Sequence, residues 1–263
     1  NQGNLWFGHL DGGLTRYDGF RFENITFDSV QIKGDITSIA ETGDQKLWIT
    51  TTASGAFLIS HPFGEPSGMK IRQYKGSDGL SDQVFGSTQT KDGSFYCLTE
   101  VGINRYNPGE DRFENFILKG LTHYWTKTCM LEDSKKNLWF GTYNGGLYKY
   151  DKQLDSIIVY DKRDGLAKNW ISCLTEDRNG NIWVGTFGGG ITVISEKGLH
   201  NYTMANGLND DYVKCIYEDH EGNILIGTQY HGFSIFKGEA FVSLSEKEGL
   251  SNPNIWAIFE GQD

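Results

Sequence analysis

The chain has 263 residues, among them 34 Gly, 4 Pro and 7 Trp, and its 24 Lys plus Arg against 34 Asp plus Glu give a formal net charge of −10. This acidic balance, with no basic stripe, argues against a nucleic-acid partner, and the absence of a long apolar run argues against contact of this segment with a membrane. The 14% of aromatic residues and the many glycines favour short strands joined by tight turns, so we expect an all-β fold.

A short motif recurs six times along the chain. It begins as Asn4-Leu-Trp-Phe-Gly, and its central anchors in chain order are Trp6, Trp48, Tyr96, Trp139, Trp183 and Leu225. Subtracting neighbouring anchor numbers gives spacings of 42, 48, 43, 44 and 42 residues. Periods of about 40–45 residues with strand-like content are typical of propeller blades. The sequence therefore predicts six repeats within a single β-propeller domain over 1–263.

The strands of one repeat can be followed over residues 165–202. Alternating apolar residues predict strands at 170–176, 181–186, 191–195 and 198–202, with Asp or Gly at the corners between them. This is the pattern of one four-stranded antiparallel blade.

The two ends of the chain complement each other. Residues 255–260 read as a first strand with no second strand after it, and residues 4–8 read as a second strand with no first strand before it. Pairing of these terminal strands would close the ring and remove two unprotected sheet edges.

One position of the first strand is small in every repeat: Ser38, Gly86, Cys129, Cys173, Cys215 and Ala257. First strands converge near a propeller axis, where crowding admits only small side chains. The anchor aromatics, by contrast, should wedge between adjacent sheets. Because three of the four cysteines share this position and no CxxC occurs, we expect free, buried thiols and neither a disulfide nor a metal site.

Acidic residues end the predicted first strands: Glu132-Asp133, Glu176-Asp177, Glu218-Asp219 and Glu260. They could form a calcium-binding ring. Each pair, however, opens a tight turn in which Asp is favoured for local hydrogen bonding, so the turn interpretation is preferred. The sequence predicts no cofactor, and recognisable catalytic motifs are absent.

Two sets of loops should open on one face of a propeller: those that enter the first strands and the hairpins between second and third strands. The first set carries His123, Tyr124, Trp125, Trp170, Tyr212 and Trp256, and the second carries His9, Asp11, Tyr143, Asn144, Phe187, Tyr230 and His231. Aromatic planes mixed with amide and hydroxyl groups suit the apolar faces and polar edges of sugars. We therefore expect a small polar ligand such as an oligosaccharide to bind these residues.

Phrases such as Ile171-Ser-Cys-Leu-Thr-Glu-Asp177 and Gly180-Asn-Ile-Trp-Val-Gly-Thr186 closely resemble the two-component regulator propeller repeat. The resemblance implies the periplasmic or extracellular sensor of a hybrid histidine kinase, and the expected partners are the other domains of the parent sensor and a second copy of the chain in a homodimer. Family propellers usually have seven blades, whereas this chain supplies six. The resemblance thus implies a fragment of a longer sensor protein.

Three functions fit the sequence. The leading one is a module that binds a ligand and signals to a kinase. An enzyme such as a streptogramin-type lyase is the alternative, with His123 or His231 as the base. A protein-binding scaffold fits the fold equally well, because fold does not fix function.

Overall fold

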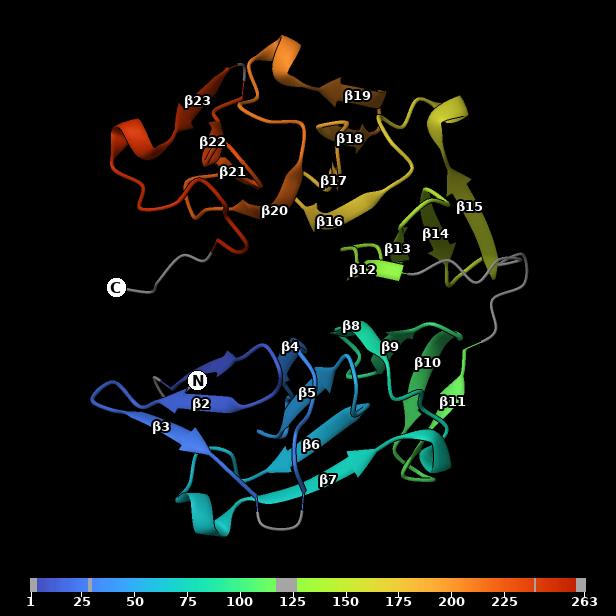
Figure 1. Ribbon diagram of the computed structural model, residues 1–263. Helices are drawn as coiled ribbons and strands as arrows, with labels where there is room; N and C mark the ends of the chain where they lie inside the picture. Colours follow the sequence, from blue (N-terminus) through green and yellow to red (C-terminus); the bar gives the residue numbers. More distant parts are fainter. Residues whose placement is uncertain (1–3, 28–29, 117–126, 239, 259–263) are drawn as a thin grey trace. The chain divides into compact units, whose positions relative to one another are not determined.

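The computed structural model describes residues 4–27, 30–116, 127–238 and 240–258 (Figure 1). Two compact units are present, residues 1–127 and residues 128–263, and each is described separately. In the described ranges all regular structure is β-strand, apart from five short 3-10 turns, and no helix is long and apolar enough to cross a membrane.

The first unit contains three antiparallel sheets, each a simple meander. Sheet 1 has three described strands, and sheets 2 and 3 have four each. The strands are β1 (Leu5–Gly8), β2 (Leu14–Tyr17) and β3 (Phe22–Ile25) in sheet 1, β4 (Ile36–Glu41), β5 (Leu47–Thr51), β6 (Ala56–Ser60) and β7 (Lys70–Tyr74) in sheet 2, and β8 (Val84–Gln89), β9 (Phe95–Thr99), β10 (Gly102–Asn107) and β11 (Arg112–Asn115) in sheet 3.

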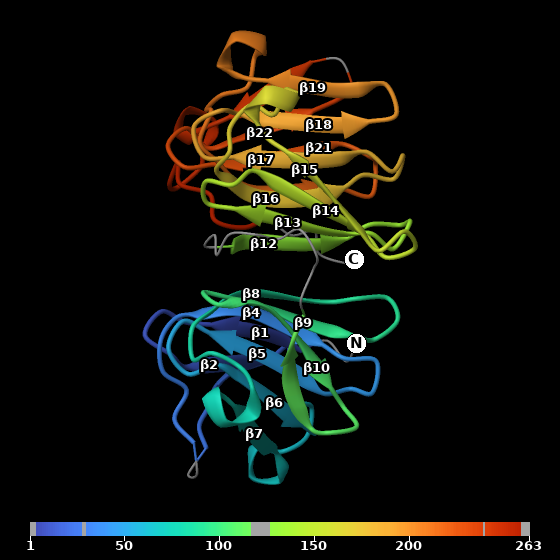
Figure 2. The same ribbon diagram turned by 90° about the vertical axis from the view of Figure 1, so that its right-hand side faces the viewer.

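The second unit contains three four-stranded meanders (Figure 2). The strands are β12 (Lys127–Glu132), β13 (Leu138–Thr142), β14 (Leu147–Asp151) and β15 (Ser156–Tyr160) in sheet 4, β16 (Ile171–Glu176), β17 (Ile182–Thr186), β18 (Ile191–Ser195) and β19 (Gly198–Tyr202) in sheet 5, and β20 (Val213–Glu218), β21 (Ile224–Thr228), β22 (Phe233–Phe236) and β23 (Phe241–Leu244) in sheet 6. The strand order predicted for residues 165–202 is confirmed in sheet 5.

The anchor aromatics pack between neighbouring sheets, as predicted. Trp48 of sheet 2 stacks on Phe95 of sheet 3 with ring centroids 4.5 Å apart. The ring centroid of Trp183 in sheet 5 lies 5.3 Å from that of Phe236 in sheet 6. The second strands that carry these anchors are the most deeply buried, and every residue of β5, β9, β13 and β17 is buried. The core of each unit therefore lies between its sheets.

The C-terminal segment differs from its prediction. Residues 255–258 form no strand, although the Ile255 amide donates to the Thr228 carbonyl at 2.9 Å. Phe259 and Glu260 lie outside the described residues. A strand needs a hydrogen-bonding partner along its length. Among the hydrogen bonds that the structure describes, this segment bonds to β21 through its first residue alone. Ring closure by 255–260 and 4–9, and the single domain over 1–263, stay predictions.

Size complementarity explains the small position of the first strands. Cys173 lies opposite Gly185 and Cys215 opposite Gly227, whereas Gly86 lies opposite Leu98. A Cβ atom on Gly227 would lie 2.5 Å from Cys215 Sγ. A cysteine on the first strand thus requires glycine on the second, because close-packed interiors hold one of the two side chains.

All four cysteines are free, as predicted. Cys97 is buried, but Cys129, Cys173 and Cys215 are half-buried, so the expectation of full burial was wrong for these three. Their strands are the edge strands of sheets 4, 5 and 6, which leaves one side of the backbone without a neighbour in its sheet. Burial still raises the pKa of the Cys173 and Cys97 thiols well above the usual range, and that of Cys215 to about 11.

We expect these raised pKa values to make the thiols slow to alkylate. The thiolate is the reactive form, so at pH 8 iodoacetamide should modify Cys97 and Cys173 much more slowly in the folded chain than in urea. Mass spectrometry of timed samples measures this. Four modified thiols after unreduced denaturation would confirm free cysteines, and rapid labelling of folded Cys173 would contradict its enclosure.

The aspartates after the first strands hold the turns, as the preferred interpretation had it, whereas Glu176 and Glu218 bond to the neighbouring sheet. Asp133 accepts hydrogen bonds from the Asn137 backbone and side-chain amides, both at 2.7 Å, and from Trp139 Nε1 at 2.8 Å. Asp177 holds Asn181 and Trp183 in the same way. The carboxylate thereby ties the turn to the buried anchor of the following strand.

Candidate functional site

Six aromatic side chains lie in series in the second unit, five in ring contact and one joined through a lysine, and we call them the aromatic row. Its members are Tyr143, Trp170, Phe187, Tyr212, Tyr230 and Trp256. The hairpins between second and third strands carry Tyr143, Phe187 and Tyr230. Trp170 and Tyr212 directly precede the first strands β16 and β20, and Trp256 lies in the segment after β23. The row therefore draws on sheets 4, 5 and 6.

Successive rings from Tyr143 to Tyr230 are in contact. The Trp170 ring centroid lies 4.2 Å from that of Tyr143 and 4.2 Å from that of Phe187. Tyr212 follows, with its centroid 4.9 Å from Phe187 and 5.5 Å from Tyr230. These separations fall in the range of favourable tilted and edge-to-face ring pairs.

Lys214 of β20 joins Trp256 to the rest of the row. Its Nζ lies 4.2 Å from the Trp256 ring centroid and 5.3 Å from that of Phe187. Partial burial lowers the pKa of Lys214, and the two ring faces stabilise its ammonium by cation–π attraction. Sequence reasoning missed this residue.

The row is open to solvent along most of its length. Tyr143, Tyr230 and Trp256 are 49%, 52% and 70% exposed, while Trp170 and Phe187 are half-buried between their neighbours. Exposed aromatic faces in contact with one another form an apolar surface with hydroxyl groups at its edges. Such a surface can stack against a sugar ring and donate hydrogen bonds to its hydroxyl groups.

A nearly buried carboxylate fixes one end of the row. Asp210 accepts hydrogen bonds from the Tyr212 and Tyr230 backbone amides, both at 3.0 Å, and its Oδ2 lies 3.4 Å from His231 Nδ1. Asn209 Nδ2 also donates to the His231 carbonyl at 2.7 Å. Sequence reasoning missed Asp210, although an Asp two residues before an exposed Tyr is a recognisable side-chain turn signal.

The structure brings most of the predicted site residues together. Asn144 is exposed beside Tyr143 in the β13–β14 hairpin, and His231 is exposed beside Tyr230. His9 and Asp11 belong to the first unit, where His9 Nε2 lies 2.7 Å from Thr15 Oγ1 and the Asp11 amide donates to Asp35. The predicted residues His123, Tyr124 and Trp125 lie outside the described residues.

The enzyme alternative rests on His123 and His231. Among the described residues, the carboxylate paired with His231 is that of Asp210, whose two oxygens already accept from backbone amides. The arrangement shows how Asp210 orients the loop, and a catalytic role of His231 stays a prediction.

Comparisons with known proteins agree with the repeat pattern. Residues 120–144, 165–188 and 207–230 match the family model described as the two component regulator propeller. No curated protein matches the chain. These three matched segments contain the anchors of sheets 4, 5 and 6.

Solved structures resemble the chain over nearly its whole length. The extracellular domain of a hybrid two component system from B. thetaiotaomicron matches with a TM-score of 0.81 and 22% identity, over 99% of this chain and 36% of that one. A second such domain from that organism matches with a TM-score of 0.68 and 18% identity, over 90% and 42%. The chain thus spans less than half the length of these two extracellular domains.

A virginiamycin B lyase from Staphylococcus aureus, solved with quinupristin, also matches, with a TM-score of 0.73 and 12% identity, over 95% of this chain and 83% of that one. At such identities the structures show the fold and not the activity. The recurring anchors, the six antiparallel sheets and the similar solved structures agree that the chain is a β-propeller, and three segments in its second unit match the two component regulator propeller repeat.

Proposed function

We propose that this propeller is the extracytoplasmic ligand-sensing part of a two-component signal transduction regulator, and that it binds an oligosaccharide on the aromatic row. The observation that carries the proposal is the contact of five rings from three sheets on a solvent-exposed surface, with Trp256 joined to them through Lys214. The likeness to extracellular domains of two component systems supports the periplasmic or extracellular location.

The geometry suggests how binding could become a signal. The rings sit on loops of three different sheets, so a sugar chain that stacks on several of them stabilises one arrangement of those loops over others. A ligand shifts a conformational equilibrium by its difference in affinity for the two states. The other domains of the parent sensor would receive that shift, and no chemical reaction of the ligand is required.

Calorimetric titration of an oligosaccharide panel tests the proposal. We expect micromolar to millimolar affinity, which corresponds to about 4–8 kcal/mol of binding free energy. Tyr143→Ala and Tyr230→Ala should each weaken binding by about 3- to 10-fold, since one ring contact contributes about 0.5–1.5 kcal/mol. Both side chains are about half exposed, so their removal should change the melting temperature little.

Phe20→Ala is the matched control, because Phe20 is 95% exposed and lies in the first unit. Trp170→Ala is a poorer test, since Trp170 packs between two other rings and its loss would disturb the row itself. Absence of heat with every saccharide, or unchanged affinity in Tyr230→Ala, would count against the aromatic row as the binding site.

A further inference from the structure

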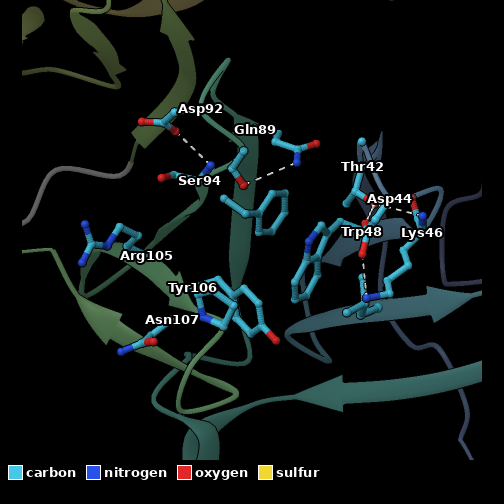
Figure 3. Close-up of a pocket in the computed structure, with 15 residues that line it drawn as sticks. Thr42, Asp44, Lys46, Trp48, Gln89, Asp92, Ser94, Arg105, Tyr106 and Asn107 are labelled. Atoms are coloured by element: carbon cyan, nitrogen blue, oxygen red, sulfur yellow. Dashed lines mark hydrogen bonds and ion pairs between the residues drawn. The ribbon is translucent and has the colours of Figure 1, made fainter.

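The first unit has a pocket of about 660 Å³ between sheets 2 and 3 (Figure 3). It lies at the turns between the first and second strands, and the apolar residues Trp48, Leu58, Phe95 and Tyr106 contribute to its walls. Its polar lining includes Thr42, Asp44, Lys46, Gln89 and Asn107. The volume is within the usual range for small-molecule sites.

The pocket is open because a contact between the two sheets is missing. In the second unit, Arg178 of sheet 5 reaches across to Glu218 of sheet 6 with its Nε 2.6 Å from Oε1. Ser134 of sheet 4 likewise bonds to Glu176 of sheet 5.

In sheet 2 the position of Arg178, two residues after the end of the first strand, is taken by Gly43. In sheet 3 the position of Glu218, the last residue of the first strand, is taken by Gln89. Gly43 has no side chain, and Gln89 Nε2 donates to the Gly93 carbonyl of its own sheet at 3.5 Å. No hydrogen bond that the structure describes joins these two positions. The inter-sheet bridge of the second unit is therefore replaced by the pocket.

The indole donor of this sheet also lacks the acceptor that its equivalents have. Trp139 and Trp183 donate their indole N–H groups to the turn aspartates Asp133 and Asp177. At the matching turn position sheet 2 has Thr42, whose hydroxyl bonds within the turn. Trp48 is 3% exposed, lines the pocket, and its indole N–H has no hydrogen-bonding partner among the described residues. The indole N–H is thus free to donate to solvent or to a ligand in the pocket.

A second residue of the turn, four positions after Thr42, also differs between the sheets, and the difference favours binding of an anion. Where sheets 4 and 5 have Asn137 and Asn181, sheet 2 has Lys46, whose Nζ lies 2.7 Å from Asp44 Oδ2. The Asp44 carboxylate raises the pKa of Lys46, so the ammonium stays charged at neutral pH. Asp44 is 60% exposed, and exposed pairs of this kind contribute little, so an incoming carboxylate can share or take over Lys46.

We propose that this pocket binds a small organic carboxylate whose carboxylate group takes the place of the absent turn aspartate, accepting hydrogen bonds from Trp48 Nε1 and Lys46 Nζ. The rest of the ligand fills the pocket beside Tyr106 and Gln89. This second site lies in the first unit and goes beyond the proposed function, because it does not depend on the aromatic row.

Glucuronate and glucose are the probes, because they differ in the carboxylate at nearly equal size. The full chain should bind glucuronate at least about tenfold more tightly than glucose in calorimetric titration. The Thr42→Asp/Lys46→Asn variant rebuilds the turn of sheets 4 and 5 and supplies Trp48 with an acceptor. We expect it to lose glucuronate binding at least about tenfold while its melting temperature rises, an outcome that misfolding cannot mimic.

Two further variants complete the test. Asp44→Asn should tighten glucuronate binding several-fold, because it removes a like charge and releases Lys46. Tyr230→Ala should leave it unchanged, which separates this site from the aromatic row. Equal binding of glucose and glucuronate, or undiminished glucuronate binding by Thr42→Asp/Lys46→Asn, would overturn the proposal.

Discussion

Replacing Asp177, a buried turn residue, by alanine should lower the free energy of unfolding by about 3 kcal/mol. Asp177 accepts hydrogen bonds from the Asn179 and Asn181 backbone amides, from Asn181 Nδ2 and from Trp183 Nε1. Without it, the 4% exposed Trp183 keeps a buried indole N–H that no neighbouring group accepts. Urea unfolding followed by far-UV circular dichroism measures the loss.

Asp219→Ala is the matched control for this change. Asp219 holds Asn223 at 2.8 Å through the same two amide hydrogen bonds, but its sheet has Leu225 in place of the tryptophan. The loss should therefore be smaller by about 1–3 kcal/mol, the cost of leaving a buried donor unpaired. Equal losses for the two variants would show that the indole hydrogen bond contributes nothing measurable.

Local signals made the strands of this chain predictable. The strands expected over 181–186, 191–195 and 198–202 agree with β17, β18 and β19 to within one residue at each end. The alternation of apolar residues and the Asp and Gly corners depend on neighbours in sequence, so one repeat contains all the information needed. The segment 255–260 has the same alternation but lacks a paired strand among the described residues, and sequence pattern alone could not reveal that.

The candidate site was partly predictable because strand order determines where loops lie. Tyr143, Trp170 and Phe187 fall in loop classes that open at one end of a meander, and their rings are in contact. Lys214 escaped notice because it lies within a strand, where its approach to Trp256 depends on the fold of the following loop.

The pocket of the first unit escaped for a different reason. It results from one pairing between sheets that is present twice in the second unit and missing between Gly43 and Gln89. A missing pairing between sheets becomes visible only when the contacts of the equivalent residues are known. Sequence comparison of the repeats would show the substitutions, but not that Arg178 and Glu218 touch.

Replacing Gly185 by alanine should cost about 1–3 kcal/mol of unfolding free energy, because the added methyl group overpacks the space between two first strands. A Cβ atom there would overlap Cys173 Sγ and would lie 2.9 Å from Val213 Cγ1. The backbone at Gly185 does not have a positive φ, so the loss would be steric and not conformational.

Cys173→Ala should partly restore the stability of Gly185→Ala, since it removes the sulfur atom but leaves Val213 in place. Gly43→Ala serves as the control for the general effect of adding a methyl group to glycine. A Cβ atom on Gly43 meets nothing within 4 Å, and its φ is also not positive, so we expect a change within about 0.5 kcal/mol. Urea unfolding of the four variants, the double variant included, measures the coupling between positions 173 and 185. If the losses of the two single variants simply add in the double variant, the sulfur atom of Cys173 and the methyl group at position 185 do not compete for the same space. That result would contradict the proposed size complementarity of cysteine and glycine.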